Sequence, residues 1–502
     1  MSAVSMSKRN FLLGAAAAAM ASTVPFRLAA AEAPVKRKRM NLLLITADDL
    51  DWSIPGFMGG RSDLMPNLDA LARRSHRFVN NRTVVPICMP SREAMMTGLV
   101  PHRSGGTGFT PVHIGTPTLT SLLQDAGYYA GAIHKVDHMM PHECFQWDYV
   151  QQSKDRSTLI QANGARVAME EARSGRKPFF VNCNSNDPHR PFYGSPAAAL
   201  VDHDQTGPYK VAREIEPHEV VVPPILEDLP NVRVELAQYW NSAQRLDVAI
   251  GHILQVLEES GERDNTVIVF CSDHGMPFPF AKATCYDYGT RVPLLISWPG
   301  MGEPREFTEL TTHMDIMPTL LDLLGLDAPE GLNGESLLPL MMGQGELGRD
   351  FTVTYVNTLS NGNAYTTRAI QDHRYSLVFS PWVDGKLKFR AESMLGLTYP
   401  AMAEAAKTDR RIAARIEQYV SGIPMAFYDL EADPGQRRNL INDQRHAGRI
   451  KAMTDRLLSE MKRTGDPEVA NLETFLAGGQ PVVTQDPQKY RLRGRGRGNG
   501  ED

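Results

Sequence analysis

Three mostly apolar runs, each followed by polar residues, constrain the fold of this chain more than any other feature. They cover residues 40–46, 177–184 and 266–271. Runs of this kind are typical of strands that are buried on both faces of a parallel sheet. Between them, residues 119–126 and 234–259 have the periodicity of amphipathic helices. We therefore predict an α/β fold in which helices flank a large mixed central sheet, with residues 266–271 as its last strand.

The pattern changes after residue 350, where short alternating runs replace the long apolar ones. Alternation over residues 352–355, 364–371 and 374–379 predicts an antiparallel sheet. We therefore expect a large α/β domain over residues 40–345 and a smaller α+β subdomain over residues 350–470.

The two ends of the chain carry signals of a different kind. Residues 1–31 combine basic Lys8 and Arg9 with an alanine-rich apolar run and small residues, as in a bacterial export signal peptide. The Ser-Lys-Arg-Asn-Phe-Leu order resembles a twin-arginine signal with one lysine, which implies export of the folded protein, so that it is periplasmic or secreted. A helix that stays attached is the alternative, although the run is too short for a stable membrane anchor. The tail, residues 480–502, is expected to be disordered.

The composition excludes several classes of protein. The net charge of −5 gives no reason to expect nucleic-acid binding, and only the Arg/Gly-rich tail could favour RNA. A hydrophobic content of 42% is ordinary for a globular chain. Five cysteines do not make a disulfide framework, and their spacing leaves open whether Cys144, Cys183, Cys271 and Cys285 pair.

Ionisable residues directly follow two of the predicted strands. Asp48 and Asp49 follow the first strand, and Asp273 and His274 follow the last one. Ligands of α/β sheets gather at the carboxyl ends of strands, and adjacent carboxylates repel one another unless a cation lies between them. A metal site is therefore expected, with a solvated Asp-Asp turn as the alternative. Calcium is favoured, although the imidazole of His274 also suits other divalent metals.

The most specific motif is the run Cys88-Met89-Pro90-Ser91-Arg92. It resembles the Cys-x-Pro-Ser-Arg motif of formylglycine-dependent sulfatases, a family of the alkaline phosphatase superfamily. The resemblance implies an alkaline-phosphatase-like fold and the oxidation of Cys88 to formylglycine by a formylglycine-generating or anaerobic sulfatase-maturating enzyme. The hydrated aldehyde would attack the sulfur of the substrate. A buried cysteine before a Pro-Ser turn is the alternative.

Further segments resemble the same family. Lys135 ends a strand and is followed by His138, one position later than in the commoner family pattern. His189 lies in an Asp-Pro-His-x-Pro loop, and Lys282 precedes a Tyr-Asp-x-Gly-x-Arg-x-Pro string. By this resemblance Lys135, Lys282 and Arg92 neutralise the sulfate, and either His138 or His189 protonates the leaving group. The implied metal ligands are Asp48, Asp49, Cys88, Asp273 and His274.

The resemblance implies a sulfated saccharide as substrate, derived from a glycosaminoglycan. Several segments, including the Asp-Pro-His-Arg loop, look most like heparan N-sulfatases, the sulfamidases. The spacing from Lys135 to His138 and the Asp273-His274 pair look like iduronate sulfatases instead. A phosphonate or phosphate ester hydrolase of the same superfamily, and a non-catalytic binding protein with the same fold, are the alternatives.

Overall fold

The computed structural model describes residues 39–198 and 210–482. The described residues belong to one compact unit. The predicted signal peptide and most of the predicted disordered tail lie outside the described residues. The division into two domains near residues 345–350 stays a prediction.

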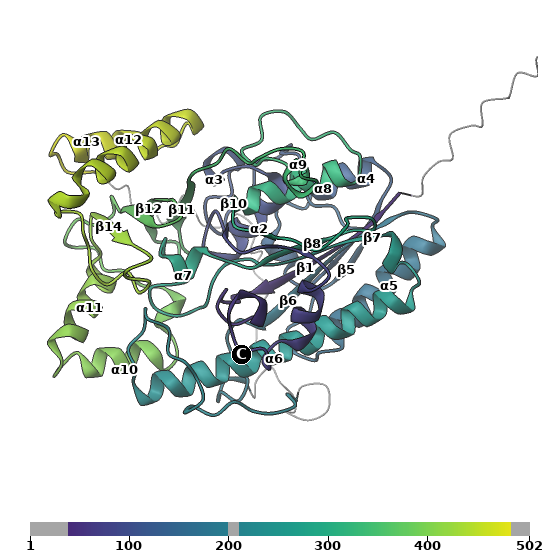
Figure 1. Cartoon of the computed structure of the whole chain (residues 1–502), viewed down its shortest axis with the longest axis horizontal. Helices are drawn as coiled ribbons and strands as arrows, with labels where there is room; N and C mark the ends of the chain where they lie inside the picture. Colours follow the sequence, from purple (N-terminus) through teal and green to yellow (C-terminus); the bar gives the residue numbers. More distant parts are fainter. Residues whose placement is uncertain (1–38, 199–209, 483–502) are drawn as a thin grey trace, which may run out of the picture. The chain divides into compact units, whose positions relative to one another are not determined.

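The central sheet has eight strands in the order β5-β4-β6-β1-β7-β8-β2-β9 (Figure 1). From β5 to β7 all neighbours are parallel, whereas β8 is antiparallel to both β7 and β2, so the sheet is mixed, as predicted. The prediction that residues 266–271 form the last strand was wrong, because three short strands continue the sheet beyond β7. The strands are β1 (Asn41–Asp48), β2 (His76–Phe78), β4 (Tyr129–Ile133), β5 (Tyr149–Gln151), β6 (Phe179–Pro188), β7 (Thr266–Ser272), β8 (Leu294–Ser297) and β9 (Glu306–Phe307).

Strand β1 lies between β6 and β7 and is buried along its whole length. Its side chains alternate between the two faces of the sheet. Leu43 and Ile45 belong to one core cluster, and Leu42 and Leu44 belong to the other. The register pairs Ala47 with Ser272 of β7, so the polar residues that follow β1 and β7 meet at one edge of the sheet.

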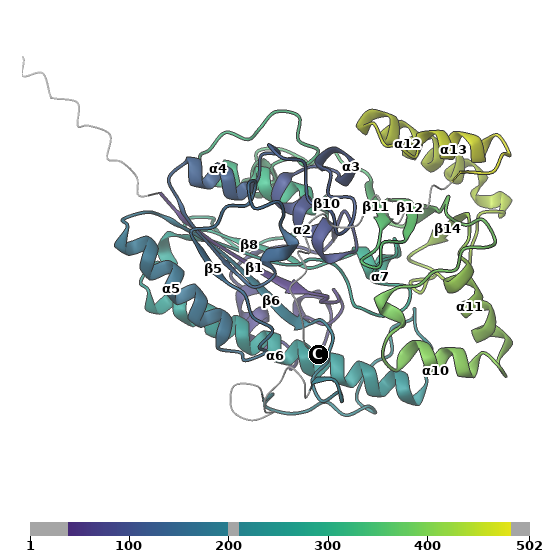
Figure 2. The same cartoon turned by 180° about the vertical axis from the view of Figure 1, so that it is seen from behind.

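Helices cover both faces of this sheet. Figure 1 shows α5 and α6 on one face and α4, α8 and α9 on the other, and Figure 2 shows the same layers from behind. The helices of this part are α1 (Pro66–Ala72), α2 (Cys88–Thr97), α3 (Pro101–Ser104), α4 (Leu119–Asp125), α5 (Ile160–Ser174), α6 (Pro230–Glu259), α7 (Asp287–Thr290), α8 (Ile316–Leu323) and α9 (Leu338–Met341). Short 3-10 turns are η1 (Gly56–Met58), η2 (Val136–His138), η5 (Arg263–Asn265) and η6 (His313–Asp315), and β3 (Asn81–Arg82) pairs with β10 (Thr311–Thr312).

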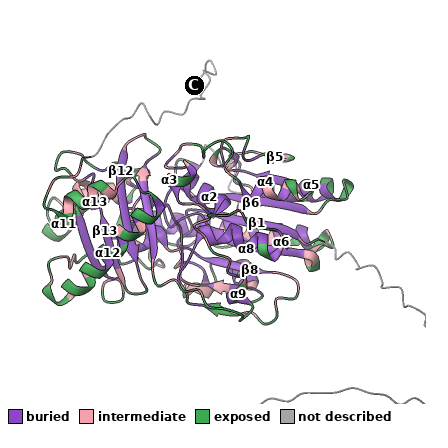
Figure 3. Cartoon of the chain, turned by 90° about the horizontal axis from the view of Figure 1, so that it is seen from above, coloured by how far each residue is buried: buried purple, intermediate pink, exposed green. Residues whose placement is uncertain are grey.

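A second antiparallel sheet follows, as predicted, and β14 joins the three predicted strands in the order β11-β12-β13-β14. Its strands are β11 (Thr352–Thr358), β12 (Ala364–Gln371), β13 (Tyr375–Phe379) and β14 (Met425–Asp429). Its helices and turns are η7 (Glu392–Met394), α10 (Thr398–Ala405), α11 (Arg410–Ser421), η8 (Gln444–His446), α12 (Ala447–Thr464) and α13 (Val469–Leu476). Figure 3 shows that the strands of both sheets are largely buried, while the outer faces of the helices are exposed. Buried Arg368 and Asp466 form an ion pair that ties β12 to the segment after α12.

The structure shows whether the cysteines pair and whether a described helix could span a membrane. All five cysteines are buried and unpaired. Within residues 39–198 and 210–482, no helix has the length and apolar character needed to cross a bilayer.

Candidate active site

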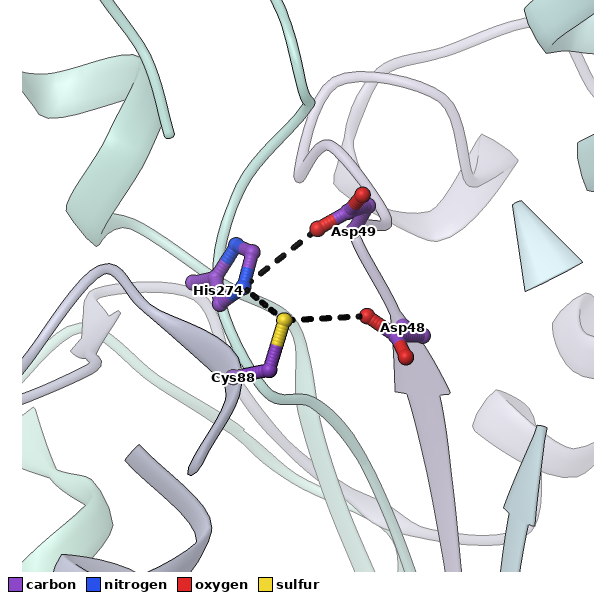
Figure 4. Close-up of side chains that lie close together, drawn as sticks. All are labelled: Asp48, Asp49, Cys88 and His274. Carbon is purple, nitrogen blue, oxygen red and sulfur yellow. Dashed lines mark hydrogen bonds and ion pairs between the residues drawn. The ribbon is translucent and has the colours of Figure 1, made fainter. Parts of the chain in front are cut away.

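The edge of the central sheet where β1 and β7 end holds a cluster of four buried side chains, Asp48, Asp49, Cys88 and His274 (Figure 4). The Cys88 sulfur lies 3.2 Å from Nε2 of His274 and 3.6 Å from Oδ1 of Asp48. Nε2 of His274 also lies 3.3 Å from Oδ1 of Asp49. One potential ligand atom from each residue lies within 4.8 Å of the others. The structure thus brings together four of the five predicted metal ligands.

The fifth predicted ligand, Asp273, adjoins the cluster and holds it in place. Its Oδ1 accepts hydrogen bonds from the backbone N–H groups of Asp49 and His274, at 3.1 and 2.8 Å. Its Oδ2 lies 2.9 Å from a guanidinium nitrogen of Arg92, and both side chains are fully buried. Asp273 therefore links the ends of β1 and β7 to the arginine of the cysteine motif.

Helix α2 begins at Cys88, the first residue of the motif. Pro90 is compatible with this start, because the first turn of a helix has N–H groups without partners in the helix. Ser91 holds the helix against β7, since its hydroxyl donates a 2.5 Å hydrogen bond to the Asp273 carbonyl and lies 3.1 Å from Nδ1 of His313. Cys88 therefore lies at the N-terminal end of a helix, where the dipole favours a negative charge.

Two lysines reach the cluster from different loops. Lys135 forms an ion pair with Asp48. Lys282 lies 3.0 Å from Oδ1 of Asp49. His134 and Lys135 both have left-handed backbone angles, with φ of 57° and 51°, in the sharp turn that follows β4. Such conformations cost energy for residues with side chains, and they often occur at functional sites.

Of the two predicted proton donors, only His189 directly contacts the cluster. Its Nε2 lies 3.9 Å from Oδ2 of Asp49, and its Nδ1 lies 2.6 Å from the carbonyl oxygen of Arg190. Because that carbonyl can only accept, Nδ1 carries the hydrogen and Nε2 faces the site. His138 packs edge-on against Phe109, with ring centroids 5.7 Å apart, and forms no ion pair within the described part of the chain.

Glu392 is a residue of the site that the sequence did not reveal. It belongs to η7, in the part of the chain that also forms the second sheet. Its two carboxylate oxygens lie 3.2 Å from Nε2 of His189 and 3.0 Å from Nζ of Lys282. No motif surrounds it, and only the tertiary contact identifies it.

The two adjacent aspartates differ in their electrostatic environments. Burial by itself raises the pKa of Asp48, but nearby cations, with Lys135 foremost, hold it well below its usual value. Burial also raises the pKa of Asp49, and there the opposing effect of Lys282 is too small, so its pKa stays well above the usual range. Burial, and next Asp48, raises the pKa of the Cys88 thiol well above its usual value. An unmodified Cys88 is therefore a protonated thiol and a poor nucleophile.

The histidines of the site are neutral near pH 7. Burial, followed by the charge of Lys282, lowers the pKa of His189 to about 3. Burial and Lys135 lower the pKa of His138 well below its usual value. Burial also lowers the pKa of His274. Neutral His274 can therefore act as a metal ligand through Nε2.

The charges of the site fit a divalent cation. Four carboxylates, those of Asp48, Asp49, Asp273 and Glu392, face three permanent cations, those of Arg92, Lys135 and Lys282. With all four carboxylates ionised, the net charge of the site is negative, which disfavours an anionic substrate. One divalent ion makes the charge positive. The oxygen-rich donor set suits calcium, while the imidazole also accepts other divalent metals.

Two charged residues of the Lys282 signature have structural contacts, which agrees with a packing role. Asp287 forms an ion pair with Arg82. The guanidinium of Arg291 lies 4.0 Å above the ring of Trp52, and its Nε donates to the carbonyl of Val79. These contacts join the loop to the edge of the sheet.

Comparisons with known proteins identify the family of this chain. Residues 40–326 match the model of the sulfatase family, and residues 273–383 match that of the N-sulphoglucosamine sulphohydrolase C-terminal region. The chain is 28% identical to human N-sulphoglucosamine sulphohydrolase over 472 residues, which cover 86% of this chain and 91% of the relative.

Solved structures share the fold. One, determined in complex with its substrate D-glucosamine-2-N,6-O-disulfate, is 19% identical, has a TM-score of 0.63, and covers 86% of this chain and 99% of its own. The phosphonate monoester hydrolase from Silicibacter pomeroyi is 18% identical, has a TM-score of 0.61, and covers 86% of this chain and 97% of its own.

Proposed function

Because this chain belongs to the sulfatase family, we propose that it hydrolyses a sulfate ester or a sulfamate on a saccharide derived from a glycosaminoglycan. The observation that carries the proposal is the position of Cys88. Its sulfur lies 3.2 Å from His274 and 3.6 Å from Asp48, at the start of a buried helix. A group formed from this side chain would therefore contact both the metal ligands and the substrate.

Conversion of Cys88 to formylglycine would supply the nucleophile for this reaction. The raised pKa of the Cys88 thiol makes direct attack by the unmodified cysteine unfavourable. The modification requires a formylglycine-generating or an anaerobic sulfatase-maturating enzyme as a partner of this chain.

Asp48, Asp49, Asp273 and His274 would hold a calcium ion beside Cys88. When bound, the ion acts as a Lewis acid and lowers the pKa of the attacking hydroxyl. The protein's own contribution is to fix the carboxylates: backbone N–H groups hold Asp273, and the register of β1 and β7 sets the two strand ends side by side.

The permanent cations of the site would bind the sulfate oxygens and stabilise the charge that develops on them. Lys135 and Lys282 each contact one of the two adjacent aspartates, so both ammonium groups lie close to Cys88. Arg92 is fully buried and is held by Asp273 and by Oδ1 of Asn184 at 2.5 Å. Preorganised charges of this kind are often worth 10²- to 10³-fold in kcat.

His189 is the favoured proton donor to the leaving oxygen or nitrogen. It contacts Asp49 directly, and its Nε2 faces the site, whereas His138 packs on Phe109. Burial, and next the charge of Lys282, lowers the pKa of His189 to about 3. A sulfate that pairs with Lys282 reduces this effect, so the tendency of His189 to carry a proton increases when the substrate binds.

The similarity to N-sulphoglucosamine sulphohydrolase favours a sulfamidase over an O-sulfatase. We further propose that the chain is exported to the periplasm or beyond, as its N-terminal signal implies. A phosphonate or phosphate ester hydrolase is the second candidate, because a phosphonate monoester hydrolase shares the fold.

Kinetics on matched substrates tests these assignments. The enzyme, produced with a maturating enzyme and calcium, is expected to release sulfate from N-sulfated glucosamine faster than from O-sulfated glucosamine. It is also expected to act on nitrophenyl sulfate faster than on a nitrophenyl phosphonate ester. Faster turnover of the O-sulfate would overturn the sulfamidase assignment, and faster turnover of the phosphonate would overturn the sulfatase proposal.

A further inference from the structure

A cavity of about 330 Å³ opens beside Lys282 and Glu392. This volume is within the range of small-ligand sites. The cavity is walled by segments far apart in the chain, including the β11–β12 turn and the loop that carries Glu392. Since Glu392 contacts both Lys282 and His189, one end of the cavity adjoins the proposed catalytic site.

One wall of the cavity is apolar. It includes Ile87, which immediately precedes Cys88, together with Phe109 and Leu359. The ring of Phe109 packs on His138 and is partly exposed. Apolar and aromatic side chains beside a few polar groups are typical of ligand pockets, and such a wall suits the apolar face of a sugar ring.

Of the charged residues that line the cavity, Glu392 has an ion-pair partner and Arg390 has none in the described part of the chain. Glu392 pairs with Lys282 at the catalytic end, where it also lies 3.2 Å from Nε2 of His189. Arg390 is exposed, and no carboxylate pairs with it in residues 39–198 and 210–482. Its guanidinium is therefore the cation of the cavity that is available for a ligand.

Hydrogen bonds hold the backbone of Arg390 in place, while its guanidinium stays available for a ligand. Its N–H donates a 3.1 Å hydrogen bond to the hydroxyl of Tyr365. Its carbonyl accepts a 2.9 Å hydrogen bond from Asn361, which also lines the cavity. The next residues are fixed as well, because Ser393 bonds to the buried hydroxyl of Tyr419 at 2.7 Å. A fixed backbone reduces the entropy lost when the side chain binds an anion.

We propose that this cavity binds the sugar that carries the scissile group, and that Arg390 pairs with a second acidic group, a carboxylate or a sulfate, on the same saccharide. The inference rests on the proposed function and names its substrate class. The carboxylate of Glu392 repels a second anion at the catalytic end, while Arg390 attracts one at the exposed end. The saccharide is thereby oriented, and a guanidinium can grip either anion with two parallel hydrogen bonds.

The test compares Arg390→Gln and Arg390→Lys with the wild type on two substrates. One is an N-sulfated glucosamine disaccharide with a uronic acid or a second sulfate, and the other is nitrophenyl sulfate, which has no second acidic group. For Arg390→Gln, kcat/KM on the acidic disaccharide is expected to fall about tenfold to hundredfold more than on nitrophenyl sulfate, mainly through KM. Arg390→Lys is expected to retain part of the preference, and the loss is expected to shrink at high salt. Arg410→Gln, at an exposed position of α11 outside the cavity, is the matched control and is expected to match the wild type on both.

Equal effects of Arg390→Gln on both substrates, or no effect on either, would overturn the inference while leaving the sulfatase proposal intact. If the wild type hydrolyses neither substrate, the proposed function fails. Calorimetric binding of the same acidic disaccharide to the wild type and to Arg390→Gln still decides the inference in that case: weaker binding by the variant supports it, and unchanged binding overturns it.

Discussion

The sulfur of Cys88 lies 3.2 Å from Nε2 of His274, although the two residues are 186 positions apart in the chain. The same imidazole nitrogen lies 3.3 Å from a carboxylate oxygen of Asp49. His274 is thus the nitrogen donor among oxygen ligands, and it should influence which ion the site prefers.

Replacing His274 with asparagine is expected to shift the metal preference toward calcium. An amide oxygen suits calcium better than imidazole does, so the affinity ratio of calcium to manganese should rise by about tenfold. Metal-free protein reconstituted with each ion, with affinity measured by calorimetry, checks this. Identical ratios for the variant and the wild type would show that His274 is not a ligand.

Cys88→Ala is expected to abolish turnover while the metal still binds. Without the convertible side chain the nucleophile is lost, so kcat should fall by roughly 10⁴-fold or more. Three carboxylates and His274 remain, and calcium affinity should change far less. Cys144→Ala, at another buried unpaired cysteine, is the control and should keep full activity.

Lys282→Met is expected to lower kcat/KM by about 10²- to 10³-fold, because it removes a cation beside the sulfate and the ammonium that pairs with Asp49 and Glu392. Steady-state kinetics measures the loss. Lys154→Met, at an exposed position, is the control. Activity of Lys282→Met within a few-fold of the wild type would exclude Lys282 from the sulfate site.

Arg368→Met is expected to destabilise the fold by about 3–5 kcal/mol, because it leaves the fully buried carboxylate of Asp466 without its partner. Unfolding in urea measures this change in free energy. Lys451→Met breaks an ion pair on the surface of α12 and should cost less than about 1 kcal/mol. Similar costs for the two variants would contradict this account.

His76 is expected to make stability depend on pH. Burial, and next Arg305, lowers the pKa of His76 to about 4 from its ordinary value of 6.5. Between pH 6.5 and 4 the folded state therefore binds fewer protons than the unfolded state. The contribution of His76 to the free energy of unfolding is fully present above pH 6.5 and is lost as the pH falls toward 4.

His76→Phe should remove roughly 1–3 kcal/mol of this pH dependence. The free energy of unfolding, measured at several pH values, gives the slope. An unchanged slope in the variant would contradict the assignment. The variant also loses the hydrogen bond that Nδ1 of His76 accepts from the Arg305 N–H, so the slope, and not the absolute stability, is the quantity compared.

Much of the central sheet could be predicted because long apolar runs identify buried strands, as with β1 and β7. The strands β8, β2 and β9 have only four, three and two residues. Strands this short depend on their neighbours and leave no periodic pattern. For this reason the sequence wrongly predicted β7 as the last strand of the sheet.

Some residues of the site could likewise be predicted from the sequence, and others could not. Asp48 and Cys88 lie in recognisable local patterns, and the parallel register explains why distant strand ends meet. Glu392 and Arg390 come from a loop without a motif, and only the tertiary structure brings Glu392 to the site and Arg390 to the cavity beside it. The start of α2 at Cys88 is hard to recognise in the sequence because proline is common in turns, although Pro90 is compatible with a first helical turn.

The most direct test of the central claim is the mass of the peptide that contains Cys88, isolated from catalytically active protein. We predict the mass of the aldehyde form, formylglycine, in a fraction that rises and falls with the specific activity of the preparation. Full activity in protein whose Cys88 peptide carries only the unmodified thiol would contradict the account.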